Sequence, residues 1–556
     1  MSKTRVLVIG LDGATWDLIR PWADSGNLPN IARLLKQGSA ASLMSTVPPI
    51  SPAAWSSFMT GKNPGQHGVF DFTVRDFRSY GMRMAQRPSD ATLWGLLSLQ
   101  QKRVCVVNVP LTYPPEQVNG YMVTGLGTPG GSRFAHPDEL GRLLRQQHYQ
   151  LNTDMTLLRD GPALFVQDVM RVAEQVTETT LHLLGQMDWD FGMVVLRLTD
   201  EIPHFFWHWM DSSHPAHVPT DALRRDAVLR AYQKADELLG RLVSEAADGE
   251  TTVILVSDHG FGPLYKDVYL NAWLQQQGFL RLRDHTDARF VGMRILQELG
   301  LTRTGVGRFL GRKRMQWLRA ALRDGLGRWG TAFPNDSQVH VSDLVDWHRT
   351  RAYSVGYIGQ IYVNLAGRDP LGIVAPGSDY EETLSQLVES LQHLVDPADG
   401  LPVVDQILRK EELYHGSHLQ DAPDLLVLMR GLRYITRHGF EFGDLDQVFA
   451  TPPTGETGGH RRDGILLVTG ANVRPDQWPV NAGIEDVAPT VLHLLGCAVP
   501  KDMDGRVLTE ILDQETASAR PVSYCDASGQ SEDAGALTAE EEQDLLDRLR
   551  RLGYVG

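Results

Sequence analysis

The chain has few cysteines, no long apolar run and no excess of basic residues. Three cysteines, Cys105, Cys497 and Cys525, are scattered over 556 residues, which excludes a disulfide framework and a cysteine-rich zinc site. No run approaches the roughly 18 apolar residues of a membrane-spanning helix, and the first apolar run is too short for a secretory signal. We therefore expect a cytoplasmic protein without a transmembrane segment.

The charge balance is acidic, with 68 Asp and Glu against 53 Lys and Arg and a formal net charge of −15. Nucleic-acid binding proteins usually present a basic face, so we expect no specific binding to DNA or RNA. A metal site or a local basic pocket could still bind an anion.

Continuous apolar segments alternate with long helical patterns along the chain. Such segments, ended by Gly or Asp, are typical of buried parallel strands. Strands that alternate with helices predict an α/β fold with a mostly parallel central sheet and helices on both faces. The strand-like segments are 5–10, 103–110, 191–200 and 251–260, and the main helical stretches are 161–187 and 221–247.

Composition changes along the chain predict its organisation. We expect a catalytic α/β core in two parts, 1–264 and 346–510, an inserted Arg-rich helical cap at 265–345, and a polar linker with a C-terminal helix at 511–556. The basic face of the cap could be solvated, attract an anionic substrate or lie on a membrane surface. Thr538 and Glu541 form a capping box before the last apolar stripe.

Acidic residues stand where three of the predicted strands end, and histidines accompany two of them. Asp200 and His204 have D-x-x-x-H spacing, and Asp258 is followed by His259. One such acid alone would be read as a helix cap, but the combination favours a ligand site at the carboxyl ends of the strands. Nitrogen and oxygen donors of this kind suit zinc or manganese better than magnesium. The full donor set is Asp12, Asp200, His204, Asp258, His259 and His460.

A serine precedes proline at the start of a helical segment, in "TVPPISPAAWSSFMTG" at 46–61. Ser51 as N-cap with Pro52 in the first helical position is a strong helix start. Whether Ser51 also attacks a substrate depends on residues far away in the sequence, and a helix N-terminus would favour an alkoxide there. The two roles are compatible.

An ordered set of short motifs carries a family resemblance. "VIGLDG", "ISPAAWSSFMTGKNPGQHGVFDF", "TDEIPH", "VSDHGF" and "GGHRRDG" together resemble the alkaline phosphatase superfamily, in particular its type I phosphodiesterase and nucleotide pyrophosphatase branch. Within that branch the chain is similar to the predicted phosphohydrolases and phosphomutases. The resemblance covers 1–264 and about 345–510, and it implies an alkaline-phosphatase-like fold.

The resemblance implies two divalent metal ions, zinc or alternatively manganese, and a serine nucleophile. One ion would be held by Asp12, Asp258, His259 and the Ser51 oxygen, and the other by Asp200, His204 and His460. A coordinated cation lowers the pKa of a serine hydroxyl, and two cations can hold the attacking and leaving oxygens at phosphorus. Ser51 would then form a phosphoserine that water hydrolyses. Nearby His67 is expected to be structural.

One position departs from the family pattern. Many phosphodiesterase relatives have Asn three residues after the nucleophile, where this chain has Ala54. Lys62 and Asn108 are candidate replacements that would bind the substrate's phosphoryl oxygens. A solvated lysine and a turn asparagine are the structural alternatives.

The sequence therefore predicts a metal-dependent phosphoric ester hydrolase, more a phosphodiesterase or pyrophosphatase than a monoesterase. The alternatives are a phosphomutase or phospho-group transferase using the same site, a non-catalytic metal-stabilised scaffold, and a surface-associated protein acting on lipid or glycan phosphates. A sulfatase is disfavoured, because Pro52 and Trp55 break the C/S-x-P-x-R pattern. Whether the substrate is a nucleotide, lipid or sugar phosphate stays open, as does the oligomeric state.

Overall fold

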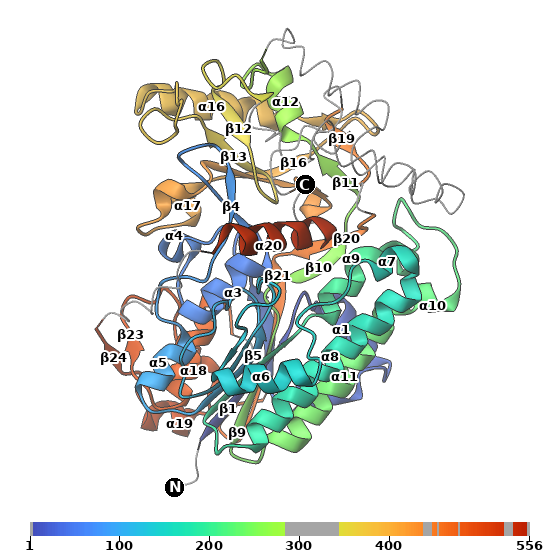
Figure 1. The fold of residues 1–556 in the computed structure, drawn as a ribbon, viewed down its shortest axis with the longest axis vertical. Helices are drawn as coiled ribbons and strands as arrows, with labels where there is room; N and C mark the ends of the chain where they lie inside the picture. The colour runs from blue at the N-terminus through green and yellow to red at the C-terminus, as the bar shows by residue number, and fades with distance from the viewer. Residues whose placement is uncertain are drawn as a thin grey trace, which may run out of the picture.

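The structure is a computed structural model that describes residues 4–283, 344–437, 447–452, 455–475, 479–526 and 537–552 (Figure 1). Its larger unit is built on a nine-stranded sheet. The strands of this sheet are β1 (Arg5–Leu11), β2 (Ser39–Met44), β5 (Val104–Val109), β6 (Gly120–Thr124), β7 (Ala135–His136), β8 (Phe191–Leu196), β9 (Thr251–Val256), β21 (Asp463–Thr469) and β22 (Ala482–Gly483). Across the sheet they follow the order β22-β2-β21-β9-β1-β8-β5-β6-β7.

Neighbouring strands in the centre of this sheet run parallel. β1 pairs in parallel with β8 and β9, and β5 pairs in parallel with β6 and β8. Towards the edges, β21 is antiparallel to both of its neighbours and β7 is antiparallel to β6. The prediction of an α/β fold with a mostly parallel central sheet is confirmed. The carboxyl ends of the central strands meet at one edge, where ligands of open α/β sheets bind.

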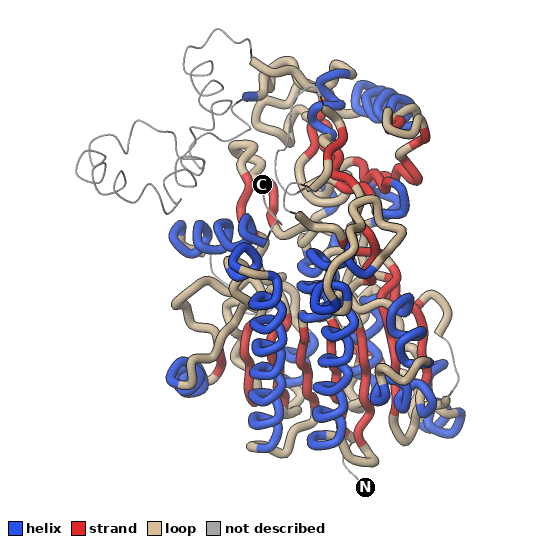
Figure 2. Tube along the Cα trace, turned by 90° about the vertical axis from the view of Figure 1, so that its right-hand side faces the viewer, coloured by secondary structure: helices blue, strands red, loops and turns tan. Residues whose placement is uncertain are grey.

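Helices cover both faces of the sheet (Figure 2). One face packs against α1 (Trp16–Asp24), α2 (Pro29–Gln37), α8 (Pro162–Gly185), α9 (Leu198–Met210) and α11 (Ala227–Ala246). The other packs against α3 (Ser51–Thr60), α5 (Leu93–Leu99) and α18 (Val487–Leu494). Because side chains alternate along a strand, β1 sends Leu7 and Ile9 into one core and Val6 and Val8 into the other. Burial of each such side chain contributes roughly 1.5–3 kcal/mol.

A second sheet forms a smaller unit above the first in Figure 1. Its strands are β11 (Lys266–Val268), β12 (Ala352–Ser354), β13 (Gln360–Val363), β16 (Val404–Arg409), β17 (Leu425–Met429), β18 (Tyr434–Ile435) and β19 (Phe449–Ala450). The accompanying helices are α12 (Leu270–Gln276), α16 (Ser378–Gln392) and α17 (Lys410–Leu413). Within the predicted cap, 265–283 supplies β11 and α12 to this unit, while 284–343 lies outside the described residues. The Arg-rich cap therefore stays a prediction.

Shorter elements complete the described chain. They are α4 (Pro64–His67), α6 (Asp138–Gln146), α7 (Leu157–Asp160), α10 (Ala222–Arg225), α19 (Gln514–Ala519), the hairpin β3 (Thr73–Arg75) and β4 (Met82–Met84), the pairs β14 (Val395–Asp396) with β15 (Leu401–Pro402) and β23 (Val499–Pro500) with β24 (Tyr524–Cys525), and the turns η3 (Leu419–Asp421), η4 (Arg430–Leu432), η5 (Ile484–Asp486) and η6 (Thr509–Ile511). None of the helices in the described ranges is both long and apolar enough to cross a membrane.

The C-terminal helix α20 (Ala539–Leu552) lies between the two sheets, next to β4 (Figure 1). The predicted capping box at its start is confirmed. The backbone N–H of Glu541 donates to Thr538 Oγ1 at 3.2 Å, and the N–H of Thr538 donates to Glu541 Oε2 at 2.9 Å. The start of α20 is thus fixed beside β4.

Candidate active site

Ser51 is the first residue of α3 and is almost fully buried. Its Oγ lies 3.3 Å from His259 Nε2 and 3.5 Å from Asp12 Oδ1. The prediction that Ser51 is the N-cap is wrong, because Ile50 takes that position and no side chain caps the helix. The hydroxyl instead points at an acid and an imidazole, at the end of the helix that carries a partial positive charge.

Asp12 and Asp258 follow the neighbouring parallel strands β1 and β9. The backbone N–H of Gly13 donates to Asp258 Oδ1 at 3.2 Å, which holds that carboxylate beside β1. Gly13 has a φ of +66°, and a Cβ there would meet Asp200 Oδ1 at 3.0 Å. Glycine is therefore needed both for the turn and for the close approach of Asp200.

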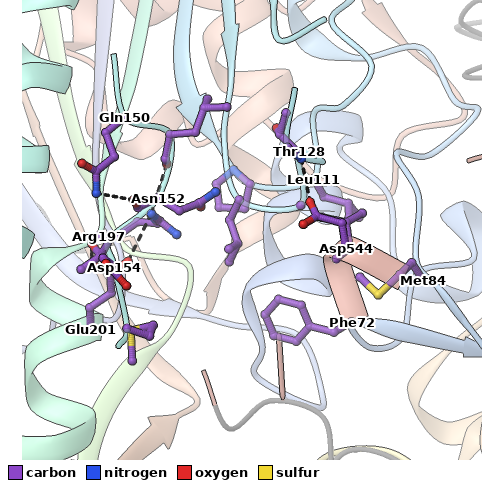
Figure 3. A pocket seen from close by; sticks show the side chains of 18 of the residues that line it. Phe72, Met84, Leu111, Thr128, Gln150, Asn152, Asp154, Arg197, Glu201 and Asp544 are labelled. Atoms are coloured by element: carbon purple, nitrogen blue, oxygen red, sulfur yellow. Dashed lines mark hydrogen bonds and ion pairs between the residues drawn. The ribbon is translucent and has the colours of Figure 1, made fainter. Parts of the chain in front are cut away.

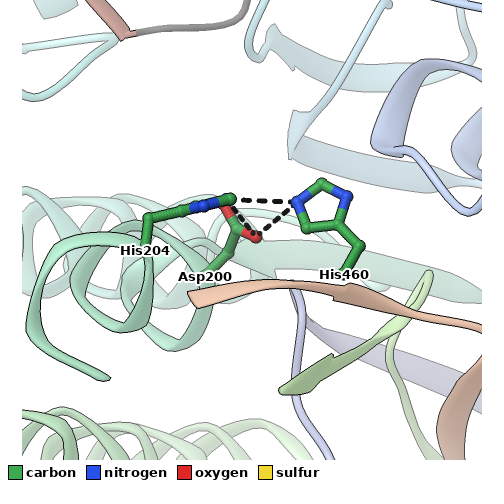
Figure 4. Close-up of side chains that lie close together, drawn as sticks. All are labelled: Asp200, His204 and His460. Carbon is green, nitrogen blue, oxygen red and sulfur yellow. Dashed lines mark hydrogen bonds and ion pairs between the residues drawn. The ribbon is translucent and has the colours of Figure 1, made fainter. Parts of the chain in front are cut away.

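Asp200 differs from its predicted place at a strand end. It lies in the first turn of α9, after β8 has ended at Leu196. Residues four apart lie on one face of a helix, and accordingly Asp200 Oδ1 is 3.3 Å from His204 Nε2. His460 Nε2 is also 3.3 Å from Asp200 Oδ1, so one carboxylate oxygen joins both rings (Figure 4).

His460 reaches the cluster through a two-stranded pairing outside the main sheet. β10 (Gly260–Pro263) runs antiparallel to β20 (Gly458–Arg461), and Phe261 is opposite His460. Since β10 directly follows His259, this pairing stacks the two imidazoles with ring centres 3.7 Å apart. Motifs about 200 residues apart in sequence are thereby joined.

The three imidazoles share one orientation. Each Nδ1 faces a backbone carbonyl oxygen, which requires Nδ1 to carry the hydrogen and leaves Nε2 as an acceptor in the neutral ring. The carbonyl partners of His204, His259 and His460 belong to Gly458, Gly260 and Pro49, at 3.1, 3.1 and 3.0 Å. Three nitrogen lone pairs therefore converge on the carboxylates.

Burial and mutual repulsion perturb the acids. Burial, together with Asp258 and Asp200, raises the pKa of Asp12 well above its usual range. Burial and Asp200 raise the pKa of Asp258 to about 7. Asp200 behaves differently: although burial opposes it, the neighbouring His204 and His460 hold its pKa well below the usual range. The three carboxyl groups of the site therefore bring more negative charge together than the neighbouring histidines compensate.

Burial also affects the imidazoles. Burial and His259 lower the pKa of His460 to about 3, and burial lowers the pKa of His259. The His204 pKa is raised, because Asp200 outweighs the effect of burial. His259 and His460 are thus neutral at physiological pH, the form in which histidine binds metals.

The donor set fits a divalent cation. Asp200, His204 and His460 offer ligand atoms within 4.8 Å of one another, and so do Asp12, Asp200 and His259. Asp258 Oδ2 lies 3.3 Å from His259 Nε2 and has no hydrogen-bond partner within the described ranges. A buried acceptor without a donor, beside further acceptors, is the pattern expected where a cation belongs.

Neither predicted substrate-binding residue joins the cluster. Lys62 lies beyond the far end of the ten-residue helix α3, about 15 Å along the helix from Ser51. Its Nζ is held at 2.7 Å by both Asp90 and Asp502. Asn108 Nδ2 donates to the carbonyl of Val195 at 2.7 Å and so ties β5 to β8. These contacts are structural, and neither residue contacts Ser51.

Two contributors to the site have little sequence signal. Trp55 Nε1 donates to Asp12 Oδ2 at 3.2 Å, and the spacing of four from Ser51 on α3 is the only hint of it. The ring of Tyr357, from the second unit, lies 5.8 Å from the ring of His460. Tyr357 lies just before β13 and belongs to no motif recognised in the sequence. Its position near His460 is therefore seen only in the structure.

The sequence of the chain matches a known protein family. The sequence model of type I phosphodiesterase / nucleotide pyrophosphatase matches residues 6–440. No curated protein matches the chain. Among solved structures, phosphonoacetate hydrolase from Sinorhizobium meliloti 1021 is similar with 13% identity and a TM-score of 0.53, over 89% of this chain and 96% of that one. Human ectonucleotide pyrophosphatase / phosphodiesterase 5 matches with 11% identity and a TM-score of 0.48, over 92% and 100%.

The family match and the geometry support each other. At such low identity, the likeness to the hydrolase structure shows the fold alone. The sequence match spans Ser51 and the donors from Asp12 to His259, whereas His460 lies beyond it and rests on its position in the structure. The chain belongs to the type I phosphodiesterase / nucleotide pyrophosphatase family and is a phosphoric ester hydrolase.

Proposed function

We propose that this enzyme hydrolyses phosphoric diesters through a phosphoserine at Ser51, with two divalent cations, zinc or manganese, in the donor cluster. The observation that carries the proposal is the position of Ser51 Oγ, 3.3 Å from His259 Nε2 and 3.5 Å from Asp12 Oδ1. A buried serine beside an acid and an acceptor imidazole, at a helix N-terminus, is placed to react rather than to pack.

The two cations would be held by the two donor groups, Asp12, Asp258 and His259 with the Ser51 oxygen, and Asp200, His204 and His460. When bound, they supply positive charge that lowers the pKa of the Ser51 hydroxyl and stabilises the oxygens around phosphorus. The carbonyl contacts of the three Nδ1 atoms fix the rings, so the donors need no rearrangement.

The reaction has two displacements. Ser51 Oγ attacks phosphorus and loses its proton to solvent, while the bond from phosphorus to the first alcohol breaks and the departing oxygen takes up a proton to leave as the alcohol. Water then attacks the phosphoserine, which releases the phosphomonoester and restores the hydroxyl. The N-terminus of α3, where Pro52 has no N–H and the other first-turn residues do, would favour the negative charge of the phosphoryl oxygens.

The test is turnover of bis-p-nitrophenyl phosphate by the wild type, Ser51→Ala and Ser56→Ala, with added zinc, manganese or magnesium. Ser56 is a matched control, because it is buried in the same helix and its Oγ has no hydrogen-bond partner in the described chain. We expect Ser51→Ala to lose at least about 1,000-fold in kcat and Ser56→Ala to stay within about twofold.

Mass spectrometry of quenched reactions identifies the intermediate as a phosphorylated Ser51 peptide. Undiminished turnover in Ser51→Ala, or in excess chelator, contradicts the proposal. Adding an alcohol as acceptor separates hydrolysis from phospho-group transfer, because a transferase yields the new ester in place of the free monoester.

A further inference from the structure

A cavity of about 470 Å³ lies next to the donor cluster (Figure 3). Pro52 and Glu201 line it, and these residues directly follow Ser51 and Asp200 in sequence. Neither Ser51 nor any of the six donors lines the cavity, which adjoins the site through these neighbouring residues. Its volume is that of a typical small-molecule site.

We propose that this cavity binds the organic group of the phosphoric diester, and that the C-terminal helix α20 forms the wall that selects it. The inference rests on the proposed function, because it takes Ser51 as the point where phosphorus is attacked. The group selected is an uncharged, ring-bearing alcohol without a second phosphate.

The cavity has an apolar side and a polar side. In Figure 3, Phe72, Met84 and Leu111 lie on one side, and Gln150 and Asn152 on the other. Phe72 and Met84 pack in one cluster with Leu545 of α20, which is 4% exposed. A ring with one apolar face fits the first side, because burial of that face is favourable.

The polar side offers hydrogen-bonding atoms without protein partners. Tyr149 Oη and Asn152 Oδ1 are both buried and have no hydrogen-bond partner among the described residues. Both residues line the cavity. Unsatisfied buried polar atoms are costly, so a ligand that brings hydroxyl or amide groups to them gains their unused hydrogen-bonding capacity.

The charges of the lining disfavour a second phosphate. Arg197 is the only cation among the described residues that line the cavity, and its Nη2 is 3.2 Å from Glu201 Oε1. Asp154 and Asp544 add two further carboxylates. An ester whose organic group carries another phosphate would meet three carboxylates and one guanidinium that is already paired.

Helix α20 is fixed over the cavity by three acceptor side chains on nearby turns. Glu541 accepts from the hydroxyl of Tyr113 at 2.8 Å, and Glu542 accepts from the backbone N–H of Met84 at 2.9 Å. Asp544 accepts from the N–H of Gly130 at 2.7 Å. The donors lie in three separate segments, so the helix has a defined position in which Asp544 and Leu545 complete the lining.

The experiment compares methyl p-nitrophenyl phosphate with thymidine 5′-p-nitrophenyl phosphate, which differ in the size of the organic group. Leu545→Trp fills the cavity, and Gln543→Trp places the same ring on an exposed position of α20 as the control. We expect Leu545→Trp to raise KM for the thymidine ester about tenfold and to leave the methyl ester within about twofold. Gln543→Trp should change neither ester.

A second variant tests the charge of the wall and leaves Leu545 in place. Its substrates are thymidine 5′-p-nitrophenyl phosphate with and without a 3′-phosphate. The wild type should prefer the ester without the 3′-phosphate, and Asp544→Lys should reduce that preference about tenfold. Equal effects of Leu545→Trp on both sizes of ester, or an unchanged preference in Asp544→Lys, overturns the inference.

Binding separates this inference from the proposed function. Calorimetric titration of Ser51→Ala with the thymidine ester measures the affinity for the ester without the nucleophile. The double variant Ser51→Ala/Leu545→Trp should bind the ester about tenfold more weakly. Unchanged affinity in the double variant contradicts the pocket assignment. Full turnover by Ser51→Ala contradicts only the nucleophile.

Discussion

The Nε2 atoms of His204 and His460 face each other at 3.1 Å, while the Nδ1 atom of each ring faces a backbone carbonyl. In two neutral rings with these tautomers, both Nε2 atoms are acceptors and cannot hydrogen bond to each other. Asp200 Oδ1 adds a third acceptor at 3.3 Å from both. Only a positive charge among them, a proton or a metal ion, makes the arrangement favourable.

The first prediction concerns metal content. Elemental analysis of the purified protein should find about two divalent ions per chain, and His460→Ala should retain about one. His182→Ala, an exposed histidine on α8, should keep both. Equal metal content in His460→Ala and wild type would contradict the assignment of His460.

The second prediction separates backbone strain from the geometry of the site. Gly13→Ala and Gly26→Ala both place a side chain at positive φ, but a Cβ at Gly26 meets nothing within 4 Å, whereas one at Gly13 meets Asp200. Both variants should lose about 1 kcal/mol of unfolding free energy. Only Gly13→Ala should lose activity, by about 100-fold, because Asp200 is displaced. Similar kcat values for the two variants would exclude this role of Gly13.

The third prediction concerns acid sensitivity. The N–H of Val69 donates to His67 Nδ1 at 3.2 Å, so His67 Nε2 carries the hydrogen and donates to Ser57 Oγ at 2.9 Å. This agrees with the expected structural role of His67. Burial lowers the pKa of His67 to about 3. A proton on Nδ1 would face the N–H of Val69, so the folded state holds the neutral ring.

Because the folded pKa of His67 lies below the unfolded value of about 6.5, its contribution is complete above pH 6.5 and is lost as pH falls toward 3. When the pH falls from 7 to 5, the unfolding free energy should decrease less in His67→Gln than in the wild type. The difference between the two decreases should be about 2 kcal/mol. Exposed His182→Gln serves as the control. Denaturant unfolding at the two pH values measures the difference, and parallel curves for His67→Gln and wild type would refute the prediction.

The fourth prediction concerns the second sheet. Buried Asp424 binds Arg368 Nη2 at 2.8 Å and Lys410 Nζ at 2.7 Å, and accepts from the hydroxyl of Tyr380 at 2.9 Å. Although burial opposes it, the two cations hold the pKa of Asp424 well below its usual range. Its contribution is therefore complete above about pH 4 and is lost as pH falls below that value.

Asp424→Asn should cost about 3–5 kcal/mol at pH 7, because it removes the carboxylate that pairs with buried Lys410 and one of the two that pair with Arg368. Urea unfolding measures the change. Glu381→Gln, which breaks an exposed pair with Arg409, should have a much smaller effect. Comparable losses in the two variants would mean that burial does not set the strength of the Asp424 network.

The central sheet was predictable from local pattern, and the structure brings the predicted donor side chains close together, while their binding of metal stays a prediction. Mainly apolar segments of six or seven residues mark β1, β8 and β9, and Asp12 and Asp258 follow within two residues of the ends of β1 and β9. The metal-ligand chemistry of Asp and His allowed His460 to be grouped with the other donors. The sequence does not show the pairing of β10 with β20 that brings His460 to His259.

Other features depend on contacts that no local pattern encodes. Ser51 resembles a cap in sequence, but Asp12 and His259, distant along the chain, engage its hydroxyl. From the sequence, Lys62 is a candidate ligand of a phosphoryl oxygen. Only the structure shows that its Nζ donates to Asp90 and Asp502. The cavity wall combines residues near 72, 150 and 545, whose proximity only the tertiary fold determines.

The position of His460 on β20 has a consequence for biosynthesis. A nascent chain exposes the proposed nucleophile and five of the six proposed donors long before the ribosome adds the sixth, His460. One of the two proposed ion-binding groups is therefore incomplete until His460 has been translated. Cellular phosphate esters would meet the complete donor set only after residue 460 has been added.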